Sequence, residues 1–176
     1  MTEHVFDPIE CDAIVAQIRR GVDSRGRAGA RHLMGIAGVP ALASDQRLIE
    51  LAAEFLGNRP IPYRATLFEK SGKANWLVVW HQDTALPLTS HIESTEWGPW
   101  SVKAGVLYAH APAWALERVV ALRVHLDPSI RENGPLRVVP GSHQYGVLPD
   151  EEVFAIGRRD ASVDCLVGRG GVVAMR

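Results

Sequence analysis

The sequence has only two cysteines, no long apolar run and no excess of charge of either sign. Cys11 and Cys165 are too few for a disulfide framework and too far apart for a CxxC motif, so we expect both to be buried as small apolar residues. With 19 basic and 20 acidic residues, the chain lacks the basic field that would bind nucleic acid or an anionic membrane. Without signal-peptide features or a membrane-length apolar stretch, a cytoplasmic protein is predicted.

The residues that are present favour one ordinary globular domain. A chain of 176 residues with 47% hydrophobic content can bury a core of its own. We predict a single domain over residues 1–176, with residues 1–59 as a helical flank and residues 60–176 as a mainly β core.

Two helices are predicted in the N-terminal flank. Asp7 and Pro8 suit a helix start, since aspartate caps the first amides and proline needs no donor at the first helical position. A second helix is predicted to begin at a Ser44 cap and to end at Gly57. The segment 21–38 between them is rich in glycine and arginine, which favours an ordered or partly mobile loop.

Short β-type runs follow from Pro60 onward: residues 63–68, 76–80, 119–126, 136–139, 163–167 and 172–175. Asn133-Gly134 lies between two of these runs and predicts a tight turn, because both residues tolerate positive φ. No long helix separates the strands, which disfavours a parallel sheet and favours an antiparallel sandwich or jelly roll. The predicted fold class is therefore α+β, mainly β, with flanking helices.

The spacing of histidines and carboxylates suggests a metal site. Facial-triad oxygenases hold Fe(II) with two histidines and one carboxylate, and a His-x-Asp pair at the end of a strand supplies two of these ligands. Three pairs of this kind occur, where about one is expected by chance: His81-x-Asp83, His91-x-Glu93 and His125-x-Asp127.

The surroundings of the first two pairs differ. His81 follows the apolar run 76–80 and Asp83 precedes a loop, a place where a metal site is both rigid and accessible. His91 and Glu93 lie in a stretch rich in Thr, Ser and Glu, which favours a solvated loop. The first pair is the better metal candidate.

The third pair lies on an alternating strand. Along residues 119–127, Arg123 and His125 share the polar face, and the residues between them are apolar. Such a face either meets water or lines a pocket, and the pattern alone leaves both open.

Two segments carry a resemblance to a known family. Trp80-His81-Gln82-Asp83 and the run 133–143, which reads Asn-Gly-Pro-Leu-Arg-Val-Val-Pro-Gly-Ser-His, resemble the two most recognisable motifs of the phytanoyl-CoA dioxygenase family. Residues 122–127 resemble the family strand before the second motif, and the likeness extends over residues 60–175. It implies a double-stranded β-helix, a jelly roll related to the cupins, and an Fe(II)/2-oxoglutarate-dependent dioxygenase with a small-molecule substrate.

The resemblance also implies roles for individual residues. His81 and Asp83 match the first two iron ligands, and Asp83 favours a hydroxylase because related halogenases have a small residue in its place. Three residues match positions that face the co-substrate 2-oxoglutarate: Thr66, Gln82 and Arg123. His143 matches the histidine of a structural turn and is not expected to bind iron. No other catalytic residue is assigned.

The run 168–176 resembles the start of the family's last stretch, which carries the third iron ligand and an arginine that binds 2-oxoglutarate. Neither residue precedes the end at Arg176, so we expect weakly bound iron and an inactive or impaired chain. The unpaired edge of an incomplete jelly-roll core favours association, which makes a homo-oligomer an expectation.

Two other hypotheses stay open. The chain could be a non-catalytic, cupin-like binding module, or His81, Asp83 and His125 could form a structural metal site that raises stability without 2-oxoglutarate. A further set of aromatic residues lies in or beside the long segment between the motifs: Trp97, Trp100, Tyr108 and Trp114. These either form a lid over the substrate or pack the loop, and we favour packing.

Overall fold

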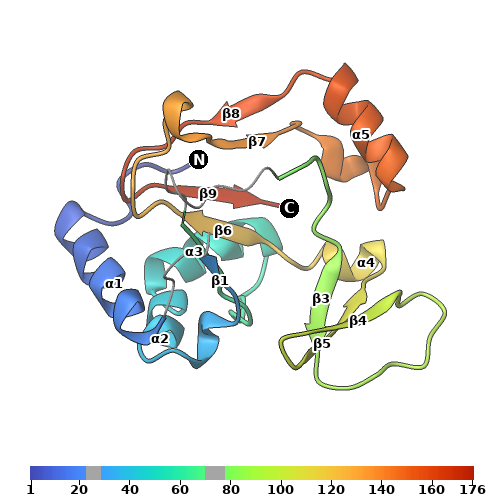
Figure 1. Cartoon of the computed structure of the whole chain (residues 1–176), viewed down its shortest axis with the longest axis horizontal. Helices are drawn as coiled ribbons and strands as arrows, with labels where there is room; N and C mark the ends of the chain where they lie inside the picture. The colour runs from blue at the N-terminus through green and yellow to red at the C-terminus, as the bar shows by residue number, and fades with distance from the viewer. Residues whose placement is uncertain (23–28, 70–77) are drawn as a thin grey trace. The chain divides into compact units, whose positions relative to one another are not determined.

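The computed structural model describes residues 1–22, 29–69 and 78–176 (Figure 1). Parts of the predicted loop 21–38 and of the predicted strand 76–80 therefore lie outside the described residues. The chain divides into two compact units, which are described separately. The first comprises residues 1–78, 120–138 and 164–175, and the second comprises residues 79–119 and 139–163 with Arg176.

The helices of the first unit begin where local capping is strongest. Helix α1, Pro8–Gly21, starts with a reciprocal capping box in which the Asp7 side chain accepts from the Glu10 amide and the Glu10 side chain accepts from the Asp7 amide, both at 2.8 Å. The predicted start of this helix is confirmed.

The second predicted helix starts slightly later than expected. Helix α3, Gln46–Leu56, is capped by Asp45, and Ser44 instead ends a short helix α2, Val39–Ala43, that the sequence pattern did not predict. The prediction of Ser44 as the cap is wrong because the Asp45 carboxylate accepts from the Arg47 amide at 3.0 Å. The predicted end at Gly57 is confirmed, with this glycine in the left-handed conformation.

The strands of the first unit are short. Strand β6, Ala121–Val124, pairs antiparallel with β9, Val172–Met175, in a register that places Arg123 opposite Val173. The N-terminal segment lies along the other edge of β9, where Thr2 and Val172 exchange two backbone hydrogen bonds. In the described part of this unit two further strand pairs occur: β1 (Gly29–Ala30) with β2 (Leu67–Phe68), and β7 (Leu136–Val138) with β8 (Val163–Cys165), of which the first residue belongs to the second unit.

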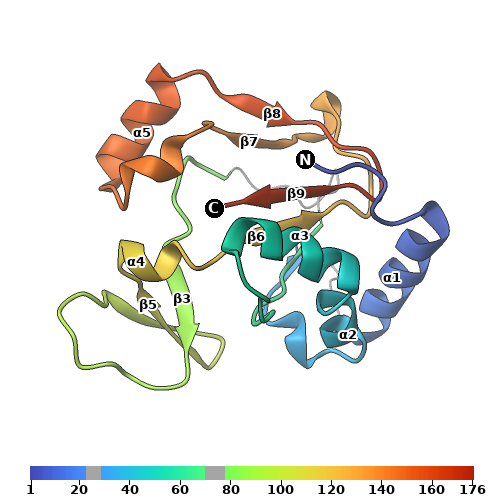
Figure 2. The same ribbon diagram turned by 180° about the vertical axis from the view of Figure 1, so that it is seen from behind.

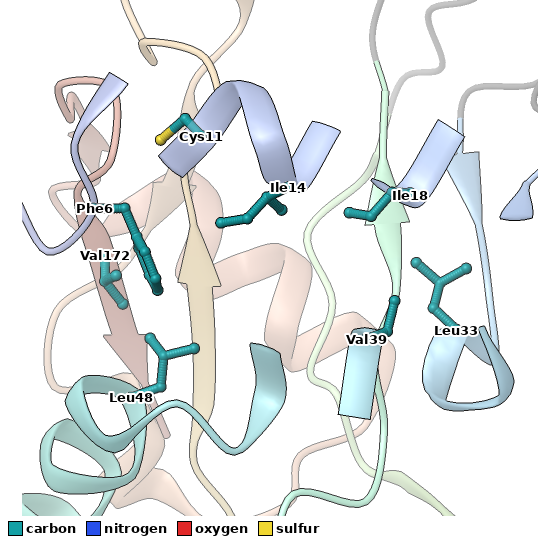
Figure 3. Close-up of a cluster of buried hydrophobic side chains, with 8 residues drawn as sticks. All are labelled: Phe6, Cys11, Ile14, Ile18, Leu33, Val39, Leu48 and Val172. Atoms are coloured by element: carbon teal, nitrogen blue, oxygen red, sulfur yellow. The ribbon is translucent and has the colours of Figure 1, made fainter. Parts of the chain in front are cut away.

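A hydrophobic core joins the helices of the first unit to its strands. Figure 3 shows its eight buried side chains: Phe6, Cys11, Ile14, Ile18, Leu33, Val39, Leu48 and Val172. Helix α3 lies against β6, as the view from behind shows (Figure 2). A second cluster contains Cys165 with Val167 and Val173. The predicted burial of both cysteines is confirmed, with exposed fractions of 0% and 3%.

The second unit contains a sheet that the sequence pattern missed. Strand β5, Val106–His110, pairs antiparallel with both β3, Ala85–Leu88, and β4, Trp100–Lys103. The long segment between the motifs thus contains a three-stranded sheet, where the sequence predicted a loop. The remaining elements of this unit are helix α4 (Ala113–Leu116), the 3₁₀ helix η3 (Ser142–Tyr145) and helix α5 (Asp150–Arg159).

The described elements are a mixture of helices and small antiparallel sheets, which is compatible with the predicted α+β class, and a mainly β core stays a prediction. Closure of the strands into a jelly roll stays a prediction. In the ranges that the structure describes, no helix is both long enough and apolar enough to cross a membrane.

Candidate functional site

The His81-x-Asp83 pair lies in the second unit, in the extended segment that leads into β3. The Nδ1 atom of His81 lies 2.8 Å from the Val79 carbonyl oxygen. Because a carbonyl only accepts, this contact is a hydrogen bond when Nδ1 carries the proton, and the lone pair of the neutral ring is then on Nε2. A second ring nitrogen fixed in this way is typical of metal-binding histidines.

Asp83 is the other candidate ligand. Its side chain is exposed, and none of the hydrogen bonds and ion pairs found among the described residues involves its carboxylate. The Thr84 amide donates to the Gln82 carbonyl at 3.1 Å, which makes a three-residue turn with Asp83 at its centre. The Asp83 carboxylate therefore lies exposed at a turn, with no hydrogen bond or ion pair to the described residues.

The residues that flank the pair anchor it to the rest of the unit. The Gln82 side chain donates to the Gly146 carbonyl and accepts from the Leu148 amide, both at 2.8 Å. Thr84 is 8% exposed, and its hydroxyl lies 2.7 Å from Nδ1 of His110 on β5. The Thr84 carbonyl also accepts from the Ala111 amide at 2.9 Å. Residues 82 and 84 thus fix the main chain on both sides of Asp83.

The donor set fits two positions of an iron site. An imidazole nitrogen and a carboxylate are two of the three ligand types that the facial triad requires. Over residues 1–22, 29–69 and 78–176, however, no three His, Cys, Asp or Glu side chains converge as a preformed metal site. His81 and Asp83 would hold Fe(II) through Nε2 and a carboxylate oxygen.

The other predicted residues lie in the first unit. Thr66 is half-buried and directly precedes β2, and Arg123 is half-buried on β6. The Arg123 guanidinium lies 5.4 Å from the ring centroid of Phe68, and in the described part of the chain no carboxylate forms an ion pair with it. Burial lowers the pKa of Arg123, with the nearby Cys165 acting in the opposite direction. The co-substrate roles of Thr66 and Arg123 stay predictions.

His125 shares this face of the first unit. It is 7% exposed, and its Nε2 atom is buried with no hydrogen-bond partner. Burial lowers the pKa of its imidazole, and the positive charge of Arg123 lowers it further. The backbone of His125 continues the ladder beyond β6, since it donates to the Gly171 carbonyl and accepts from the Gly170 amide. His125 therefore does not face water, and the alternative that this polar face lines a pocket stays a prediction.

The alternative histidines have other surroundings. His91 stacks on Trp100, with ring centroids 4.1 Å apart, and Glu93 is exposed. His143 lies in η3, within the Pro-Gly-Ser-His turn. Trp97 packs edge-on against Trp114 with a centroid distance of 6.1 Å, which agrees with the packing role favoured for these aromatics.

Three partners of the site were missed by the sequence reasoning: Gly146, Leu148 and Gly157. The first two receive the Gln82 side chain, and Gly157 lies against the Trp80 ring. No local signal identifies them, because each lies more than 60 residues from its partner.

A histidine and an aspartate at this spacing, in an anchored turn beside an antiparallel sheet, are features of metal-dependent oxygenases of the facial-triad class. The sequence model of the phytanoyl-CoA dioxygenase family matches residues 1–175, and the chain belongs to that family. Membership assigns it, at a coarse level, to the oxygenases of the Fe(II)/2-oxoglutarate type. Comparisons with curated proteins and with solved structures find no significant match.

Proposed function

We propose that this chain is an Fe(II)/2-oxoglutarate-dependent dioxygenase that hydroxylates a small-molecule substrate, with His81 and Asp83 as two of its metal ligands. The observation that carries the proposal is the state of these two side chains. The Nδ1 atom of His81 is engaged by the Val79 carbonyl, whereas the Nε2 atom of His81 and the carboxylate of Asp83 are uncommitted. Membership of the family supports the reaction class.

The residues of the chain contribute binding and orientation. The Val79 carbonyl orients the imidazole of His81, and the turn at Asp83 presents a negative charge that favours a divalent cation. Bound Fe(II) would supply the dioxygen chemistry that couples the oxidation of 2-oxoglutarate to succinate with hydroxylation of a substrate carbon. The carboxylate of Asp83 would take a metal position that a halide would otherwise need, so hydroxylation is the proposed outcome.

Arg123 and Thr66 are the proposed co-substrate-facing residues of the first unit. A guanidinium that forms no ion pair with a carboxylate in the described ranges suits the bidentate binding of a ligand carboxylate, and 2-oxoglutarate has two carboxylates. A threonine hydroxyl adds one donor and acceptor. Since the described residues provide no preformed group of three metal ligands, we expect the protein to bind the metal weakly and to turn over 2-oxoglutarate slowly.

A metal titration tests the proposal directly. Mn(II) replaces Fe(II) because it is stable in air, and its free concentration is followed by electron paramagnetic resonance. The variants H81A and D83A are compared with H91A and E93A, which remove the second His-x-Glu pair and serve as matched controls. We expect H81A and D83A to weaken Mn(II) binding by at least about tenfold, and the two control variants to retain the wild-type affinity.

The possible results separate the hypotheses. Equal loss in both pairs of variants would show that Mn(II) binds non-specifically to surface carboxylates. No binding by the wild type, with no change in its melting temperature at saturating metal, would favour the non-catalytic binding module instead. Production of succinate from 2-oxoglutarate, dependent on His81, would support the full reaction class.

A further inference from the structure

Gln82 makes a pair of long-range hydrogen bonds through a single side chain. Its Nε2 atom donates to the Gly146 carbonyl, 64 residues away, and its Oε1 atom accepts from the Leu148 amide, 66 residues away. Both distances are 2.8 Å, which is close to ideal for N–H···O contacts. The amide group of Gln82 therefore joins the His81-x-Asp83 turn to the backbone of residues 146–148.

The position of the Gly146 carbonyl, which accepts from Gln82, depends on an unusual backbone conformation. Gly146 follows η3 and has φ 73° and ψ −157°, a region that residues with a Cβ atom rarely adopt. This conformation directs the chain out of η3 so that the carbonyl of residue 146 and the amide of residue 148 both face Gln82. Tyr145 and Val147, on either side of Gly146, are exposed, whereas the two hydrogen bonds from Gln82 hold the backbone at residues 146 and 148.

The main chain of Gln82 takes part in the same arrangement. Its carbonyl closes the three-residue turn around Asp83 by accepting from the Thr84 amide. Movement of Gln82 would therefore move both neighbouring side chains, His81 on one side and Asp83 on the other. These two hydrogen bonds use one N–H donor and one lone pair of the Gln82 amide group, and the second donor and lone pair remain for the predicted contact with 2-oxoglutarate, which stays a prediction.

We propose that Gln82 is a positioning residue that holds His81 and Asp83 in a metal-binding arrangement by clamping their turn to Gly146 and Leu148. This inference rests on the proposed function, since it assumes that His81 and Asp83 bind the metal. It adds a consequence for the rest of the unit: metal binding and the order of residues 146–148 are coupled through one side chain. Removing a hydrogen-bond partner of a metal ligand costs about 10- to 100-fold in metal affinity, and Gln82, which acts on the ligands through the main chain, is expected at the lower end of that range.

Two variants of Gln82 separate the two hydrogen bonds. Q82M keeps the length of the side chain and removes both bonds, whereas Q82E keeps the acceptor for Leu148 and places a carboxylate oxygen against the Gly146 carbonyl. Q144M is the matched control, because Gln144 is exposed on η3 close to the same segment. Each variant is tested for Mn(II) affinity and for the hydrogen-exchange rate of the Leu148 amide.

We expect Q82M to weaken Mn(II) binding by about tenfold and to accelerate exchange at Leu148. The amides of β5 in the same unit should keep their wild-type exchange rates, which shows that the unit remains folded. Q82E should retain more protection at Leu148 than Q82M does, because its acceptor is preserved. Q144M should match the wild type in both measurements.

The two proposals fail in different ways. Normal Mn(II) affinity in Q82M, with a normal loss in H81A, would overturn the positioning role and leave the metal ligands intact. Unchanged exchange at Leu148 in Q82M would overturn the clamp itself. Absence of Mn(II) binding in the wild type would overturn the proposed function, and the positioning role of Gln82 with it.

Discussion

The indole ring of Trp80 packs directly on Gly157 of helix α5. A methyl group added at Gly157 would lie 2.5 Å from both Cδ1 and Cγ of the ring, which is closer than carbon atoms approach without rearrangement. Glycine in the interior of a helix costs about 1 kcal/mol relative to alanine, so its presence here is explained by the ring. Because Trp80 directly precedes His81, this contact also supports the candidate metal site.

We therefore predict that G157A destabilises the protein, even though alanine is the better helix former. Overpacking typically costs about 1–3 kcal/mol, which exceeds the gain of about 1 kcal/mol in helix propensity. Chemical denaturation followed by tryptophan fluorescence measures the change, and Mn(II) affinity should fall in the same variant. G168A is the control, since an added methyl group there meets no atom within 4 Å. A G157A variant more stable than the wild type would contradict the close contact.

Arg47 on α3 forms several polar contacts with α1 and with the segments that precede each helix. Its guanidinium donates to Glu10, to Asp45 and to the Val5 carbonyl, and it lies 4.2 Å from the centroid of the Phe6 ring. Hydrogen bonds from Arg47 are the main cause of the lowered pKa of both Glu10 and Asp45. The ring, the main chain and two carboxylates are thus held by one side chain.

We expect R47M to lower the melting temperature by several degrees at neutral pH, and R47K to recover only part of the loss because lysine cannot form the same fork of hydrogen bonds. Since the folded pKa values of Glu10 and Asp45 lie below their unfolded values, this contribution is complete above about pH 5 and disappears as the pH falls through the folded values. The difference between R47M and wild type should therefore shrink in acid. R64M, at an exposed arginine, should differ little from wild type at any pH.

Local signals explain which parts of the fold could be predicted. The capping box of α1 involves residues three apart, so Asp7 and Pro8 identified the start of that helix correctly. The hairpin between β4 and β5 was missed because its turn is Ala104-Gly105, with φ values of 51° and 79°. Alanine is rare at positive φ, and the usual Asn-Gly or Asp-Gly signal is absent from this turn.

At Asn133-Gly134 a strong turn signal is present in the sequence, but no hairpin follows from it. Gly134 does have a positive φ of 68°, but the flanking strands β6 and β7 belong to different sheets. The Asn133 side chain instead accepts from the Ile130 amide and donates to the Pro128 carbonyl. A turn signal thus predicts a change of direction, whereas strand pairing depends on residues far away in the sequence. The same holds for the candidate site. The sequence shows His81-x-Asp83 as a motif, but it does not show that Gly146 contacts Gln82 or that Gly157 contacts Trp80.

The buried imidazole of His125 predicts a dependence of stability on pH. Its pKa is lowered by burial and by Arg123, so below about pH 6.5 the unfolded chain takes up a proton that the folded chain does not. Stability is therefore complete above this pH and is lost as the pH falls toward the folded value, with a slope of at most about 1.4 kcal/mol per pH unit for one group.

H125L should flatten this dependence between about pH 5 and 7, as measured by urea denaturation at several pH values. Its backbone hydrogen bonds with residues 170 and 171 do not depend on the side chain and should persist. V124A, at the neighbouring position on β6, is the control and should lower stability by a similar amount at every pH. If H125L and wild type lose stability in parallel, another group causes the acid sensitivity.

Arg123 combines a predicted function with an unfavourable environment. A half-buried guanidinium with no carboxylate partner among the described residues has lost hydration that the contact with Phe68, at about 0.5–2 kcal/mol, only partly replaces. Replacement by methionine keeps most of the apolar stem and removes the charge. We therefore expect R123M to be at least as stable as the wild type in the absence of ligand.

The same variant should lose the response to 2-oxoglutarate. A ligand carboxylate bound by Arg123 stabilises the folded state in proportion to the logarithm of ligand concentration over Kd, and a tenfold weaker Kd removes about 1.4 kcal/mol of that stabilisation at saturation. Thermal unfolding with Mn(II), with and without 2-oxoglutarate, measures both effects in one experiment. V124A, which lowers stability without removing the charge, should keep the wild-type shift. A guanidinium kept for ligand binding should leave R123M at least as stable as the wild type and abolish the shift with 2-oxoglutarate. An R123M variant that is less stable than the wild type and keeps the full shift would instead show that Arg123 has a structural role.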